Sequence, residues 1–155
     1  MKIKLLAVGR LKASPLKDLC DEYQKRITPS ITLKEIDPPR DATKAQEAQL
    51  ILKDLPDNAF IVALDERGTT LSSPAFSEKI AQWRDMAPGN EITFIIGGAD
   101  GLDETIRKRA GFLLSFGQQT WPHMLVRVMI LEQIYRAQQI YRAQQILSGH
   151  PYHRA

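Results

Sequence analysis

Short apolar segments and helix-forming segments alternate from one end of this chain to the other. Five apolar runs have the length and composition of buried strands, at residues 3–8, 31–36, 60–64, 92–96 and 112–116. A helix-forming segment follows each run. This order is typical of an α/β fold in which a mainly parallel sheet carries helices on both faces. With 155 residues the chain is long enough for one compact domain, which we expect to span residues 1–155.

Local signals place the helices. Ser14-Pro15 and Ser73-Pro74 each combine a capping serine with a proline that fits the first helical turn. The other helices are expected over residues 42–55 and 104–110, and from Pro122 to about residue 148.

The stretch at residues 65–68, with sequence DERG, is predicted to be a turn that closes the third strand. We expect Glu66 in that turn to be a solvated side chain.

Composition narrows the possible classes of function. The net charge of +3 permits a polyanionic partner without requiring one. Cys20 is the only cysteine, so there is no internal disulfide, and no Cys/His cluster has the spacing of a zinc site. No apolar run approaches the roughly 20 residues that cross a bilayer. The N-terminus is interpreted as a strand rather than a signal peptide. We therefore expect a cytoplasmic protein with no metal and no membrane partner.

Two glycines and then a third follow the fourth expected strand, in the segment IIGGADGLDE at residues 95–104. Glycine lets a ligand approach the backbone, and free N–H groups at a helix start suit a polar or anionic ligand. The spacing is not the G-x-G-x-x-G of dinucleotide-binding proteins. A tight turn without a ligand accounts for the same residues, and the local pattern alone slightly favours that alternative.

A polar loop follows the fifth expected strand, in the segment FGQQTWPHMLVRV at residues 116–128. Its backbone amides and Trp121 could hold a purine-like group. The alternative is an ordinary loop in which Trp121 packs in the core and His123 has a structural place at a helix start.

The C-terminal segment HPYHRA gathers side chains with useful chemistry. A tyrosine can stack on a base, an arginine can bind phosphate, and a histidine can move a proton near neutral pH. Chain ends are often frayed and without a role, which is the alternative here.

Taken together, these segments resemble a known family. KIKLLAVGRLK, FIVALDERG, FIIGGADGL, SFGQQTWPHMLVRVMILEQIYRA and HPYHR are similar to the RlmH family of SPOUT-class methyltransferases, and the similarity covers almost the whole chain. The resemblance implies a C-terminal trefoil knot, which periodicity alone would not predict because knots are very rare. It implies S-adenosylmethionine as cofactor, a homodimer, and methylation of N3 of a pseudouridine in 23S rRNA within ribosomal particles.

The resemblance also implies roles for individual residues. It places Leu64, Gly97 and Gly98 against the cofactor. It implies that the adenine and ribose of the cofactor are wrapped by a loop made of Gly117, Gln118, Gln119, Thr120, Trp121 and Pro122. It places His123 beside that loop. The tail residues Tyr152, His153 and Arg154 are expected to complete the partner subunit's active site. Among them His153 is a candidate base and Arg154 a candidate stabiliser of negative charge.

A second class of function stays open from the sequence. An α/β protein that binds RNA or a nucleotide without catalysis would share most of these features. Binding of S-adenosylmethionine, followed by methyl transfer to ribosomal particles, separates the two classes.

One departure from the family is a repeated hexapeptide, IYRAQQ, at residues 134–139 and again at 140–145. Six helical residues add roughly 9 Å and rotate the rest of the chain by roughly 120°. Alanine, arginine and glutamine favour a helix, so a longer helix is expected rather than a bulge. Its apolar stripe is expected to run through Val126, Ile130, Ile134 and Tyr141.

Overall fold

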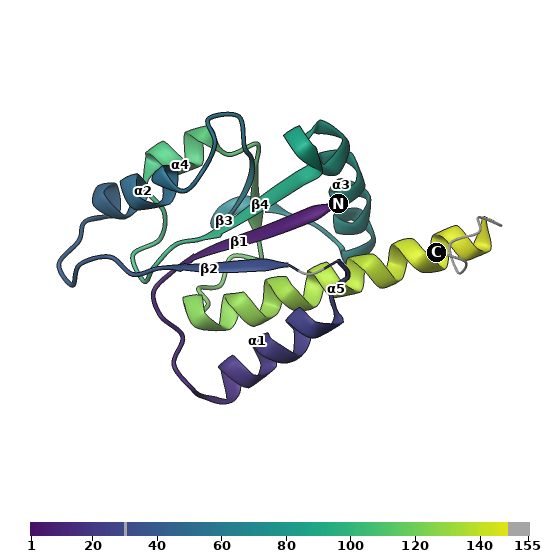
Figure 1. Ribbon diagram of the computed structural model, residues 1–155, viewed down its shortest axis with the longest axis horizontal. Helices are drawn as coiled ribbons and strands as arrows, with labels where there is room; N and C mark the ends of the chain where they lie inside the picture. Colours follow the sequence, from purple (N-terminus) through teal and green to yellow (C-terminus); the bar gives the residue numbers. More distant parts are fainter. Residues whose placement is uncertain (30, 149–155) are drawn as a thin grey trace.

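The computed structural model describes residues 1–29 and 31–148 of the chain. Its five strands form one sheet in the order β2-β1-β4-β3-β5, and every neighbouring pair is parallel. The strands are β1 (Lys2–Val8), β2 (Thr32–Ile36), β3 (Phe60–Thr70), β4 (Glu91–Ile96) and β5 (Phe112–Ser115). All five expected strands are therefore confirmed, and their carboxyl ends meet along one edge of the sheet (Figure 1).

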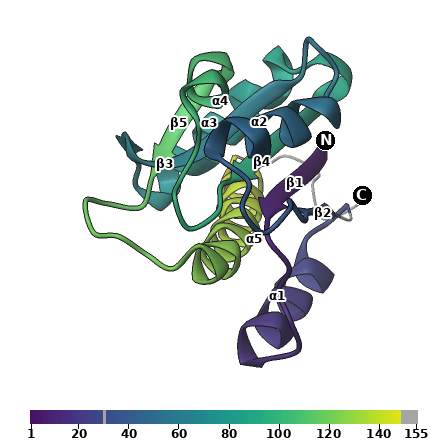
Figure 2. The same cartoon turned by 90° about the vertical axis from the view of Figure 1, so that its left-hand side faces the viewer.

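Helices cover both faces of this sheet, as expected (Figures 1 and 2). They are α1 (Pro15–Arg26), α2 (Lys44–Lys53), α3 (Ser73–Met86), α4 (Glu104–Arg109) and α5 (His123–Leu147), with a short 3-10 turn η1 (Pro88–Asn90). Alternate strand residues serve the two faces: Leu5 of β1 packs with α1, α3 and α5, whereas Leu6 packs with α2 and α4. The core is thus split into two layers by the sheet.

The cap signals place the helix starts to within a residue. The Ser14 hydroxyl accepts a hydrogen bond from the Lys17 N–H at 3.2 Å, and Pro15 is the first residue of α1. The predicted cap of α3 is one residue late: Ser72 caps the helix, and Ser73 already belongs to it. Both serines precede Pro74, so the sequence alone could not separate them.

The predicted turn at residues 65–68 is wrong, because β3 continues to Thr70. Its pairing with β5 shifts register between Leu64 and Thr69, both of which face Leu114. A Cβ on Gly68 would lie 2.4 Å from the Leu113 carbonyl oxygen, so the irregular stretch needs glycine where the two strands meet. The strand therefore bulges and resumes instead of ending.

The long helix α5 runs unbroken through both copies of the hexapeptide, which confirms the expected helix extension. The first copy is embedded more deeply than the second: Ile134 is fully buried and Ala137 is 3% exposed. In the second copy Ala143 and Gln144 are exposed, and Tyr141 keeps 37% of its surface accessible. The buried stripe therefore ends at Ala137, and the last turns of α5 project past the sheet (Figure 1).

Candidate functional site

A cavity of about 410 Å³ opens where the bulged middle of β3, the carboxyl ends of β4 and β5 and the start of α5 meet. Residues 97–102 form one wall and the loop at residues 116–121 forms another. The predicted site residues that line it are Leu64, Gly97, Gly98, Gly117, Gln119, Thr120, Trp121 and His123. The strand ends predicted from the sequence thus come together in one place, as parallel α/β sheets arrange their ligand sites.

Two predicted residues, Gln118 and Pro122, stand outside the lining. Both belong to the same loop and are exposed. The tail residues Tyr152, His153 and Arg154 lie outside the described residues, as does His150.

Apolar side chains form the inner wall of the cavity. Ile96, Leu102 and Leu114 are buried there, and Leu64 and Val126 are half-buried beside them. Trp121 is 39% exposed at the cavity, so it is not the core residue of the alternative interpretation. A flat apolar group such as a nucleobase fits a wall of this kind.

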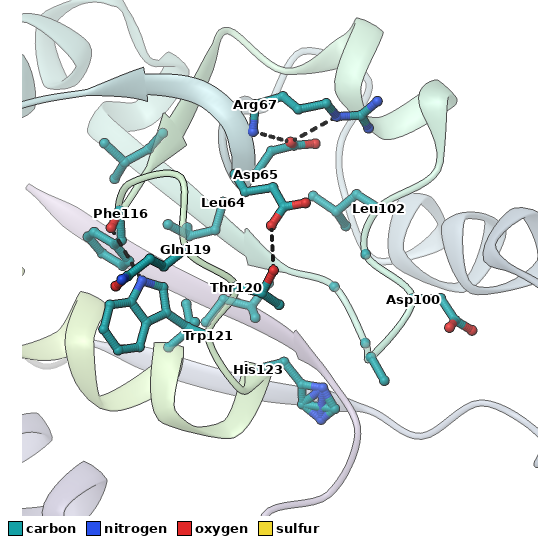
Figure 3. A pocket seen from close by; sticks show the side chains of 18 of the residues that line it. Leu64, Asp65, Arg67, Asp100, Leu102, Phe116, Gln119, Thr120, Trp121 and His123 are labelled. Atoms are coloured by element: carbon teal, nitrogen blue, oxygen red, sulfur yellow. Dashed lines mark hydrogen bonds and ion pairs between the residues drawn. The ribbon is translucent and has the colours of Figure 1, made fainter.

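Hydrogen bonds hold the loop at residues 117–122 in shape (Figure 3). The Gly117 N–H donates to Ser115 Oγ at 3.0 Å, and Gly117 has φ +110°, a conformation that favours glycine. The Trp121 Nε1–H donates to the Phe116 carbonyl oxygen at 3.3 Å. Thr120 Oγ1 donates to Glu66 Oε2 at 3.2 Å and so joins the loop to β3.

The paired glycines after β4 lie in tight surroundings, and the turn itself requires Gly97. A Cβ on Gly97 would lie 2.9 Å from the backbone of Gly101, and a Cβ on Gly98 would lie 3.2 Å from Val8 Cγ1. The Gly101 N–H closes this turn on the Gly98 carbonyl oxygen at 3.0 Å. The tight turn is therefore confirmed, and the same residues form one wall of the cavity.

Several charged residues at the cavity were not predicted as site residues. Lys44, Asp65, Arg67 and Asp100 line it together with Glu66, which is exposed as expected but belongs to a strand. Asp65 is only 6% exposed and forms ion pairs with Arg67 and Arg107. Asp100 stands within the glycine segment singled out from the sequence, whereas Lys44 begins a helix whose local pattern gives no sign of a ligand.

Next to the cavity, a glutamate on α2 has an altered affinity for protons. Burial, and then the negative charge of Asp100, raise the pKa of Glu47 above its ordinary value. Its carboxylate faces Gly98: a Cβ there would lie 3.5 Å from Glu47 Oε2. The cavity lining therefore carries carboxylates, such as Glu66 and Asp100, together with the cations Lys44 and Arg67, and the Glu47 carboxyl stands beside Gly98.

His123 is the first residue of α5 and lines the cavity. Burial, and then the positive charge of Arg127, lower the pKa of His123 below its ordinary value of 6.5. The imidazole is therefore neutral at physiological pH, the form that can accept a proton.

Within residues 1–29 and 31–148 there is no group of three or more His, Cys, Asp or Glu side chains placed to hold a metal ion. No helix of that part is long and apolar enough to cross a membrane.

Comparison with known proteins extends these observations to the whole chain. A family model described as "Predicted SPOUT methyltransferase" matches residues 1–153. The "Ribosomal RNA large subunit methyltransferase H" of Rhodospirillum centenum is 50% identical over 159 residues, and the match covers 100% of both chains. The protein of the same name from Paramagnetospirillum magneticum is 45% identical over 158 residues, covering 99% of each chain.

A solved structure shares the fold at much lower sequence similarity. It is described as a probable methylase family protein from Haemophilus influenzae Rd KW20 and aligns with a TM-score of 0.61 at 12% identity. The alignment covers 93% of this chain and 69% of that one.

An all-parallel sheet with a cavity at the ends of its strands places the protein in the class of α/β proteins whose ligand sites lie at that edge. The chain belongs to the SPOUT methyltransferase family. Membership implies S-adenosylmethionine as the methyl donor and the trefoil knot of the family's fold.

Proposed function

We propose that the protein transfers a methyl group from S-adenosylmethionine to N3 of a pseudouridine in 23S rRNA. The observation that carries this proposal is the cavity, which gathers residues from both glycine-bearing loops and from the start of α5. The proposal is also supported by the full-length similarity of the chain to proteins named as ribosomal RNA large subunit methyltransferases.

The cavity suits S-adenosylmethionine in size and chemistry. A volume of about 410 Å³ lies within the range of small-molecule sites. The apolar wall of Leu64, Leu102 and Leu114 suits the adenine, and the Asp100 carboxylate suits ribose hydroxyls or the positively charged end of the cofactor. These residues would hold the cofactor.

The methyl transfer requires the protein to position the two substrates and to supply a group that takes a proton. When bound, S-adenosylmethionine supplies an electrophilic methyl group on its sulfonium. The N3–H of a uracil-type base is a poor nucleophile until its proton leaves, so a group of the protein must take that proton as the N–C bond forms. A positive charge near the base would stabilise the anion.

Two imidazoles can take the proton. His123 lies in the cavity wall and its lowered pKa keeps it neutral. His153 is the second candidate base, and Arg154 is the candidate stabiliser of the anion. Family resemblance assigns both, with Tyr152, to the tail that completes the partner subunit's active site. Activity lost in His153→Gln and kept in His123→Asn would assign the base to the tail, and the reverse would assign it to α5.

The protein is further proposed to act as a homodimer built largely on α5. A hollow of about 570 Å³ lies between α1, α3 and α5, and Leu19, Tyr23 and Met129 are among its lining residues. Leu19 keeps 45% of its surface exposed there. A second subunit would cover this apolar surface, and its tail would complete the site. Sedimentation as a stable monomer at micromolar concentration would contradict this arrangement.

The substrate is proposed to be 23S rRNA within cytoplasmic ribosomal particles. The test is incubation of the protein with methyl-labelled S-adenosylmethionine and large-subunit particles, followed by mass spectrometry of the rRNA nucleosides. We expect label in one 3-methylpseudouridine. Cofactor binding without any transfer to rRNA would favour the non-catalytic alternative, an α/β protein that binds RNA or a nucleotide.

A further inference from the structure

We propose that Glu66 is a positioning residue: by accepting a hydrogen bond from Thr120, it holds the loop at residues 117–122 in the shape that binds the cofactor. This inference rests on the proposed function, because it takes that loop as the cofactor's. Family resemblance assigned no role to Glu66, and its sequence context indicated only a solvated turn.

The contact joins two elements that are far apart in the sequence. Thr120 Oγ1 and Glu66 Oε2 are 3.2 Å apart, and a dashed line at Thr120 in Figure 3 marks this hydrogen bond. Within residues 1–29 and 31–148, the other side-chain hydrogen bonds of the loop go to Ser115 and Phe116, directly before it. Glu66 therefore supplies the cross-link between the middle of the loop and another strand.

The backbone that carries Glu66 is itself held in place. The Ser115 hydroxyl, which is buried, lies 3.1 Å from the Glu66 carbonyl oxygen and accepts from the Gly117 N–H at 3.0 Å. The neighbouring Asp65 is anchored to α4, since its Oδ2 lies 2.7 Å from Arg107 Nε. That contact is an ion pair without the alignment of a hydrogen bond. The backbone at Glu66 is therefore held in place by β5 and, through Asp65, by α4.

The hydrogen bond between Thr120 and Glu66 has ordinary strength. Its length of 3.2 Å exceeds the roughly 2.5–2.7 Å of a charge-assisted O–H···O⁻ contact, and both side chains are exposed. Both residues line the cavity, as do Trp121 and His123. If Thr120 were released, the central part of the loop could move. Cofactor binding would then have to order the loop, and this entropic cost would weaken the affinity for the cofactor.

Paired substitutions separate a positioning role from direct contact with the cofactor. Thr120→Val removes the donor at constant shape and Glu66→Ala removes the acceptor, whereas Thr120→Ser and Glu66→Gln keep a donor and an acceptor. Glu78→Ala removes the same charge from an exposed position on α3 and is the matched control. All three positions are at the surface or the cavity rim, so folding should survive.

The first measurement is hydrogen–deuterium exchange at residues 117–121 in the cofactor-free protein. We expect Thr120→Val and Glu66→Ala to speed exchange roughly three- to tenfold, with most of the protection regained in Thr120→Ser and Glu66→Gln. Exchange as slow as in the wild type would overturn the proposal. Because no cofactor is present, this outcome is independent of whether the proposed function is right.

The second measurement is affinity for S-adenosylmethionine by calorimetry. We expect each disrupting variant to bind roughly three- to tenfold more weakly, and the double variant to be no weaker than either single one. Two results would show that Glu66 binds the cofactor directly and would overturn the positioning role. One is additive losses of affinity in the double variant. The other is an equal loss of affinity in Glu66→Gln and Glu66→Ala with no loss in Thr120→Val. Failure of the wild type to bind would instead contradict the proposed function.

Discussion

Arg127 and Glu35 form an ion pair, with Arg127 Nη1 2.6 Å from Glu35 Oε2. The Arg127 side chain is 1% exposed, and its second arm donates to the Gly9 carbonyl oxygen at 2.7 Å. Glu35 also accepts from the Leu11 N–H at 2.6 Å. This pair thus ties α5, β2 and the segment after β1 together, close to the start of α5, where His123 meets the cavity.

Removing Glu35 should destabilise the protein strongly, because it leaves a buried guanidinium without its carboxylate. We expect Glu35→Ala to lower the free energy of unfolding by about 3 kcal/mol, measured by urea denaturation. Asp37→Ala is the control: its pair with Arg10 spans 3.8 Å between largely exposed side chains and should contribute less than about 1 kcal/mol. Equal losses in the two variants would contradict the structural role of the Glu35 pair.

The lowered pKa of His123 predicts a specific pH dependence. Its charged form is disfavoured in the folded protein by burial and then by Arg127, so its contribution to stability is present above pH 6.5 and is lost as the pH falls through the folded pKa. An NMR titration, with the resonance assigned through its loss in His123→Asn, should give a midpoint below 6.5. A midpoint at or above 6.5 would show that the imidazole is not buried beside Arg127.

The repeated hexapeptide supplies its own matched controls, because identical residues have different surroundings. Ile134 is fully buried, whereas Ile140 is half-buried, so Ile134→Ala should cost about 3 kcal/mol and Ile140→Ala about 1 kcal/mol. The Gln138 side chain bonds to both the N–H and the carbonyl oxygen of Thr28, at 3.2 and 2.7 Å, while Gln144 is exposed. Gln138→Ala should therefore destabilise more than Gln144→Ala. Equal effects within each pair would mean that the second copy is packed as well as the first.

The parts of this fold that follow from nearby residues could be predicted from the sequence. The apolar runs predicted the five strands, and Ser14-Pro15 predicted the start of α1. The extension of β3 could not be predicted, because it depends on pairing with β5 beyond a bulge and on an ion pair between Asp65 and Arg107, which are distant in sequence. The glycine-bearing loops predicted a ligand site from the sequence. Lys44 could not be predicted as part of it, because Lys44 lines the cavity only through the packing of α2.

Deleting residues 140–145 should separate cofactor binding from methyl transfer. The second copy lies beyond the cavity and lengthens α5 by roughly 9 Å, and even about 1 Å of misplacement can cost about a hundredfold in rate. We expect the deletion to leave affinity for S-adenosylmethionine unchanged and to raise the rate of transfer at least about tenfold. An unchanged or lower rate would mean that the longer helix belongs to the working enzyme.

The most direct test of the account is calorimetric titration of S-adenosylmethionine into the wild-type protein and into Leu64→Trp, which places an indole in the cavity. Met86→Trp adds the same group at a position that is 66% exposed and outside the lining, and serves as the control. We expect the wild type and Met86→Trp to bind alike, and Leu64→Trp to bind roughly tenfold more weakly or not at all, given the usual cost of overpacking. No binding by the wild type, or equal binding by all three proteins, would contradict the placement of the methyl donor in this cavity.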